Sequence, residues 1–112
     1  MSYEGNFLYK VNQDFTYTVT AIGEKAFEDC TWLTAINIPN SVTDIGTQAF
    51  MDCTSLTQVN IGGGVMSIGN YAFEGCEKLT VYCEASVAPD TWSVNWNYDN
   101  RPVVWGYKGE PI

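Results

Sequence analysis

Histidine is absent from this 112-residue chain. Its absence excludes the serine–histidine and cysteine–histidine pairs of nucleophilic enzymes and every imidazole metal site. The 13 carboxylates could supply a pair for glycoside hydrolysis, but they lie mostly at variable, outward positions such as Glu24, Glu28, Asp29 and Glu74. We therefore expect no catalytic residue, no metal and no cofactor, and we expect that the protein is not an enzyme.

Basic residues and long apolar runs are also scarce. Five Lys and Arg against 13 Asp and Glu give a formal net charge of −8, whereas nucleic acids and anionic membrane surfaces bind clustered cations. No apolar run approaches the roughly 20 residues that span a bilayer, and the start MSYEGNFLYK lacks the features of a signal peptide. We expect no nucleic-acid partner and no membrane insertion, and an exported parent protein would supply this chain in mature or excised form.

What the sequence does contain is a repeat. The strings IGEKAFEDCTWL, IGTQAFMDCTSL and IGNYAFEGCEKL begin at Ile22, Ile45 and Ile68, in steps of 23 residues. Ile, Gly, Ala, Phe, Cys and Leu recur at the same places in all three copies. A fixed period in the twenties is typical of a solenoid, in which each coil buries its apolar face against the next.

The pattern inside each copy predicts how one coil is built. Period-two alternation in LTAINIP and LTQVNIG predicts short strands with the Ile and Val side chains inward. The third strand, in LTVYCEA, lacks one residue, so alternation places Val81 and Cys83 inward and Thr80, Tyr82 and Glu84 outward. The segment EKAFEDC and its equivalents predict one helical or 3-10 turn per coil.

The cysteines also follow the repeat. Cys30, Cys53 and Cys76 occupy one equivalent position, and Cys83 lies in the third strand. Equivalent side chains on neighbouring coils point the same way, which is a poor approach for a disulfide. We expect buried free thiols that act as small core residues; one disulfide, with Cys83 as the best candidate, is the alternative.

The two ends depart from the repeat, as a solenoid requires if its terminal cross-sections are to be covered. FLYKVNQDFTYTV predicts an N-terminal β-hairpin cap within residues 1–21, ahead of three repeats in residues 22–84. Residues 85–112 form an aromatic C-terminal cap, in which Val103, Val104 and Trp105 are expected to seal the last coil. The whole chain, 1–112, is predicted to be a single domain.

The string IGxxAFxxCxxLTxIxIPxSVTxIG, present as residues 22–46, resembles the BspA-like class of leucine-rich repeats of bacterial and protozoan surface proteins. The resemblance covers residues 22 to about 84. It implies a leucine-rich-repeat-like, right-handed β/α superhelix with short parallel strands. It also implies a secreted or cell-surface location and adhesion to proteins of a host or of neighbouring cells.

We therefore predict a protein-interaction module, expected to be a monomer, that binds a host or cell-surface protein through the solenoid face. The candidate partner contacts are outward or unusually large residues at variable positions: Trp32, Ala35, Asn37, Met51, Gln58, Asn60, Thr80 and Tyr82. The alternative is carbohydrate binding by exposed aromatic residues of the C-terminal cap: Trp92, Trp96 and Tyr98. A third possibility is a terminal spacer of a longer surface array, without a ligand of its own.

Overall fold

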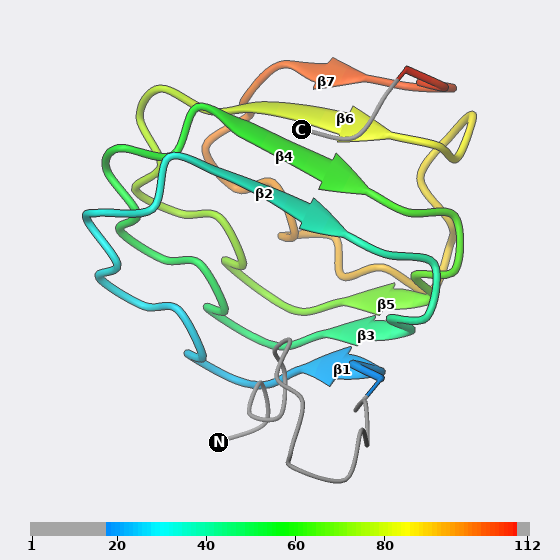
Figure 1. Cartoon of the computed structure of the whole chain (residues 1–112), viewed down its shortest axis with the longest axis horizontal. Helices are drawn as coiled ribbons and strands as arrows, with labels where there is room; N and C mark the ends of the chain where they lie inside the picture. Colours follow the sequence, from blue (N-terminus) through cyan, green and yellow to red (C-terminus); the bar gives the residue numbers. More distant parts are fainter. Residues whose placement is uncertain (1–17, 110–112) are drawn as a thin grey trace, which may run out of the picture.

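The structure is a computed structural model that describes residues 18–109. These residues form a solenoid with two parallel sheets (Figure 1). The smaller sheet contains β1 (Ala21–Ile22), β3 (Asp44–Ile45) and β5 (Ser67–Ile68), in that order. The larger sheet contains β2 (Ala35–Ile38), β4 (Gln58–Ile61), β6 (Thr80–Cys83) and β7 (Val103–Val104). Most of the predicted N-terminal hairpin lies outside the described residues.

Strand register follows the repeat. In the larger sheet Ile36 pairs with Val59, and in the smaller sheet Ile22 pairs with Ile45, both at the 23-residue step. Between β4 and β6 the step falls to 22 residues, because Val59 pairs with Val81. Val81 is fully buried and Tyr82 is not, so the inward and outward faces predicted for the shortened third strand are confirmed.

The segments that lead from the smaller sheet to the larger one stack on the third side of the solenoid (Figure 1). The prediction of a helical or 3-10 turn is not confirmed here, because the described residues contain turns and no helix. Lys25 and Asp29 have positive φ angles of 58° and 61°, and their equivalents in the second copy, Gln48 and Asp52, have 58° and 61°. A left-handed residue at every fourth position stops the helical hydrogen-bond series.

Hydrogen bonds in this segment alternate between the coil itself and its neighbour. The N–H groups of Lys25 and Phe27 donate to the carbonyl groups of Thr47 and Ala49 in the following coil, at 3.0 and 2.7 Å. The intervening N–H groups donate to carbonyl groups three residues earlier in the same coil. Beside the strands the direction is reversed: N–H groups, such as that of Gly46, donate to carbonyl groups of the preceding coil.

The core lies between the three sides. The rings of Phe27, Phe50 and Phe73 form one column, with centroids 5.1 and 5.3 Å apart and planes within 6° of parallel. Trp96 ends the column edge-on, its ring centroid 6.3 Å from that of Phe73 and its plane turned by 83°. Offset stacks and edge-to-face contacts are the arrangements that aromatic rings prefer, so each coil extends the same packing.

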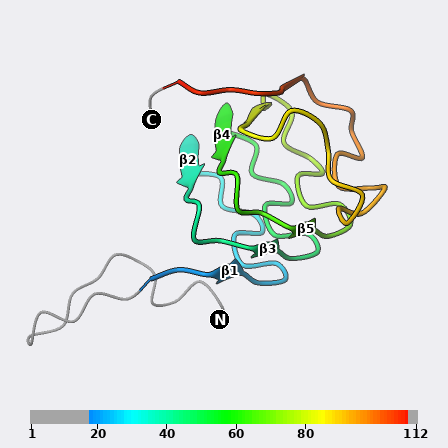
Figure 2. The same ribbon diagram turned by 90° about the vertical axis from the view of Figure 1, so that its right-hand side faces the viewer.

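Residues after Cys83 continue as a fourth turn of the solenoid although they lack the repeat motif. This turn lies across the end of the stack opposite to β1 (Figure 2). Its strand β7 pairs in parallel with β6. Asn95 O accepts the N–H of Tyr71 at 3.0 Å, and the carboxylate of Asp99 accepts the N–H of Gly75 at 2.8 Å. The last turn therefore supplies acceptors where the third repeat presents donors.

Candidate functional site

The outer face of the larger sheet carries a row of polar side chains held in register. Asn37 of β2 pairs with Asn60 of β4, and Asn60 pairs with Tyr82 of β6. Nδ2 of Asn60 donates to Oδ1 of Asn37 at 2.8 Å, and Nε2 of Gln58 donates to Oδ1 of Asn60 at 3.0 Å. The first of these hydrogen bonds joins β4 to β2, the second runs along β4, and together they fix the orientation of the amide groups.

A pocket of about 380 Å³ opens beside this row, where the strands end and the turns begin. We call it the sheet-face pocket, and its principal lining residues are Asn37, Asn40, Asn60, Tyr82, Glu84 and Tyr107. Three of them, Asn37, Asn60 and Tyr82, belong to the predicted contact set. A volume of this size is within the range of ligand pockets, about 300 to 1,000 Å³.

One wall of the sheet-face pocket is aromatic. The rings of Tyr82 and Tyr107 lie with centroids 4.8 Å apart and planes at 54°. The N–H of Tyr107 donates to the carbonyl of Cys83 at 2.8 Å, so the fourth turn holds the second ring next to the strand that carries the first.

The opposite rim of the sheet-face pocket is polar. The N–H of Gly63 is shared between Oδ1 of Asn40, at 2.8 Å, and Oε1 of Glu84, at 3.2 Å. Glu84 is exposed, and its carboxylate brings negative charge to the rim. The site therefore combines aromatic faces, amide groups and one carboxylate.

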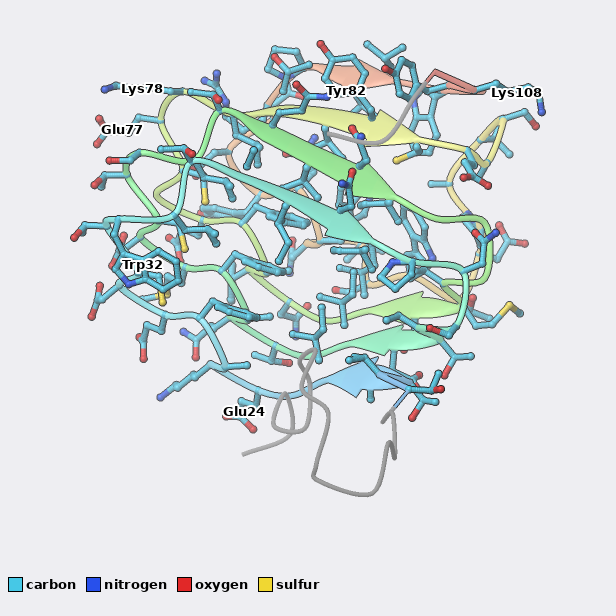
Figure 3. All side chains as sticks on the ribbon, in the orientation of Figure 1. Glu24, Trp32, Glu77, Lys78, Tyr82 and Lys108 are labelled. Carbon is cyan, nitrogen blue, oxygen red and sulfur yellow. The ribbon has the colours of Figure 1, made fainter. Side chains whose placement is uncertain are left out.

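The remaining predicted contacts lie away from this pocket. Ala35, Gln58 and Thr80 are paired across the sheet at the amino ends of their strands, outside the pocket lining. Trp32 is 71% exposed and lies beside the turn segment that precedes β2, apart from Tyr82 (Figure 3). Met51 belongs to the turn segment and accepts a hydrogen bond from Gln48 at 3.4 Å.

The three aromatic residues predicted as an open glycan platform do not form one. Trp92 and Trp96 are only 6% and 8% exposed and pack edge-on, with centroids 5.1 Å apart. Tyr98 is exposed, and it contacts Tyr71 rather than either tryptophan. The two tryptophans are buried because the phenylalanine column ends here and large rings cover its last member. Trp105, expected to be a sealing residue, packs on Trp92 and Trp96 with centroids 6.1 and 6.2 Å apart, and at 36% it is the most exposed of the three indoles.

All four cysteines are free thiols. Sγ of Cys53 donates to the carbonyl of Phe27, and Sγ of Cys76 donates to that of Phe50, each at 3.1 Å. Burial raises the pKa of the Cys83 thiol to about 12, which disfavours the nucleophilic thiolate. The thiols thus serve the core, and the geometry gives them no chemical role.

Three of the principal lining residues, Asn40, Glu84 and Tyr107, were not among the predicted contacts. The sequence does contain a signal for Glu84, because alternation makes it the next outward residue after Tyr82. No periodic signal exists for Tyr107, which reaches the pocket only because the fourth turn pairs with β6.

Two further findings bear on the class of protein. Within residues 18–109 no cluster of three acidic, cysteine or histidine side chains is placed to hold a metal ion. The same residues include no helix with the length and hydropathy to cross a membrane.

Known proteins that resemble this chain share its repeat. No curated protein matches the chain. Among solved structures, a leucine rich cell surface protein from Faecalibacterium prausnitzii A2-165 is 36% identical, with a TM-score of 0.49, over 62% of this chain. The match spans only 22% of that protein's length. The family description "BspA type Leucine rich repeat region (6 copies)" matches residues 6–87. This chain therefore belongs to the BspA type leucine-rich repeat family.

Proposed function

We propose that the chain is a non-enzymatic interaction module that acts at a cell surface and binds a protein of a host or of a neighbouring cell. The observation that carries this proposal is the sheet-face pocket, which lies on the outer face of the larger sheet beside an ordered row of side chains. The surface location is supported by the resemblance to BspA-like surface proteins.

Physical features of the face favour a protein ligand. Parallel pairing holds Asn37, Asn60 and Tyr82 on successive strands, about 4.8 Å apart, so a partner meets preformed groups and loses little binding energy to ordering them. Tyrosine is enriched among residues that dominate protein interfaces. The described coils offer a small area, so we expect modest affinity from one copy and stronger binding where several copies act together.

The test compares binding of the wild-type chain and the triple variant N37A/N60A/Y82A to a panel of purified extracellular-matrix proteins and mucins. A variant at Glu24 and Lys78, both exposed and both apart from Tyr82 (Figure 3), serves as the control. We expect at least one ligand whose affinity falls about tenfold or more in the triple variant only. If every ligand found binds both variants equally, the sheet face is not the binding surface. A panel without any ligand would favour a ligand-free spacer.

A second candidate is carbohydrate binding at a different place from the one predicted. The exposed ring of Trp105 borders an open hollow of about 580 Å³ that is also lined by Asn97, Asn100 and Arg101. An indole face beside hydrogen-bonding groups suits a sugar ring. Asn97, however, already uses its amide group within the protein, because both amide atoms form hydrogen bonds with the backbone of Arg101, at 2.8 and 2.9 Å.

Tryptophan fluorescence tests the carbohydrate candidate directly. A saturable change on addition of an oligosaccharide, lost in W105A and kept in Y98A, would support it. No change across a broad panel of oligosaccharides would exclude it.

A further inference from the structure

We infer that the sheet-face pocket takes a lysine or arginine side chain of the partner protein. The inference rests on the proposed function and adds the chemistry of the group that is recognised. It depends on three observations: two tyrosine rings in contact, a carboxylate at the rim, and the acidity of the chain as a whole.

The tyrosine pair supplies electron-rich faces. Tyr82 and Tyr107 both line the pocket, and the angle of 54° between their rings keeps them from covering one another completely. A cation that lies over a tyrosine face within about 6 Å is attracted by the ring quadrupole. Tyr82 lies in β6, and the N–H of Tyr107 donates to the carbonyl of Cys83. The backbone therefore places both rings before a ligand binds.

Glu84 supplies the counter-charge. Its Oε1 atom accepts from the N–H of Gly63 at 3.2 Å. Within residues 18–109 no lysine or arginine forms an ion pair with its carboxylate. Lys108 stands between two lining residues, Tyr107 and Gly109, but is not itself among the residues that line the pocket. The pocket therefore presents negative charge that the described coils leave unneutralised.

The surroundings exclude the other kinds of side chain. An acidic group would meet the charge of Glu84 and a chain of net charge −8. A purely aliphatic group would fill the space but would gain nothing from the carboxylate or from the amide groups of Asn37 and Asn60. A lysine or arginine places its methylene stem against the rings and its charged end at the rim, which is how these side chains commonly pack.

The experiment uses blocked pentapeptides Gly-Ser-X-Ser-Gly, in which X is arginine, lysine, glutamine or glutamate, titrated into the ¹⁵N-labelled chain. We expect the arginine and lysine peptides to shift the Gly63 amide resonance saturably, with Kd on the order of millimolar. The glutamine and glutamate peptides should cause no saturable shift. Equal shifts with arginine and glutamine would overturn the inference.

Matched variants identify the groups that carry the effect. E84Q and E77Q remove the same charge, but Glu77 precedes β6 at the other end of the strand (Figure 3). We expect E84Q to weaken the arginine peptide about two- to fivefold and E77Q to leave it unchanged. Y82A should weaken binding about two- to thirtyfold, the range of a cation–aromatic contact, while Y82F keeps most of the affinity. Equal effects of E84Q and E77Q would mean that only net charge matters and would also overturn the inference.

The two proposals can fail separately. If a matrix protein loses affinity for N37A/N60A/Y82A while the arginine and glutamine peptides behave alike, the sheet face binds proteins but not through a cation. If the arginine peptide binds as expected and no protein ligand depends on the sheet face, the pocket chemistry stands and the proposed function falls.

Discussion

Replacement of Phe50 by alanine is the sharpest test of how the solenoid is held together. Phe50 is fully buried, and its ring contacts Phe27 on one side and Phe73 on the other. Truncation of a buried phenylalanine costs about 3 to 5 kcal/mol of unfolding free energy, and each lost ring pair contributes about 0.5 to 1.5 kcal/mol of that. With two pairs lost, we expect F50A to cost about 4 to 5 kcal/mol, a large part of the roughly 5 to 15 kcal/mol that stabilises a typical domain.

The same substitution at the first position of the column is the matched comparison. Phe27 is only partly buried, so F27A should cost less than F50A, about 2 to 3 kcal/mol. Urea unfolding followed by circular dichroism and by tryptophan fluorescence gives both values. F50L, which keeps most of the volume, should recover more than half of the loss. Equal costs for F50A and F27A would show that the contribution of a ring to stability does not follow its burial.

Three further predictions concern backbone contact, thiol reactivity and pH. A methyl group on Gly69 would lie 2.5 Å from the backbone nitrogen of Thr47, so G69A should lower the free energy of unfolding by about 1 to 3 kcal/mol. G63A meets only the flexible Glu84 side chain at 3.1 Å and should cost less in the same urea assay. Burial raises the pKa of Cys83 to about 12, so an alkylating reagent at pH 8.5 should not modify this thiol in the folded chain but should modify it in urea. The protonated thiol contributes fully to the stability of the fold below pH 9, and this contribution should be lost as the pH rises toward 12. Hydrogen bonds from Ser67 and then Thr43 lower the pKa of Asp44, so S67A should raise that pKa in an NMR titration. The wild-type chain should melt at a higher temperature than S67A, and this difference should disappear as the pH falls through the pKa of Asp44.

Much of the fold was predictable because the repeat imposes the same physical demand on every coil. The positions of Ile, Phe, Cys and Leu mark the core, and alternation in the strands marks the faces, including the one-residue shift at Val81. These inferences depend on which side chains must be buried, and the spacing of the apolar residues indicates that directly.

The turn segments could not be predicted in the same way. EKAFEDC suits a helical turn by composition, yet Lys25 and Asp29 adopt left-handed backbone. The gain is tertiary: alternate N–H groups bond to the following coil, and that neighbour is invisible to a local pattern. Tertiary contacts commonly override propensity in this manner.

The site was only partly predictable for a related reason. Asn37, Asn60 and Tyr82 could be placed on one face, because parallel strands at a fixed step keep equivalent positions together. The aromatic residues of the last turn gave no such guide, since no period relates them to the coils beneath. Burial of Trp96 and exposure of Trp105 depend on where the phenylalanine column ends.

The directions of the hydrogen bonds between coils affect how two such solenoids can stack end to end. On the turn side each coil donates forward, whereas beside the strands N–H groups such as those of Gly46 and Thr80 donate to the preceding coil and that of Val81 donates to the following one. A coil inserted by translation finds donors facing acceptors on every side. Two stacks that met end to end about a two-fold axis would instead place like groups against each other on the turn side, whereas the strand edges, which present both donors and acceptors, can pair as antiparallel strands. Hydrogen bonding that continues on every side of the solenoid at once is therefore heterologous, head to tail.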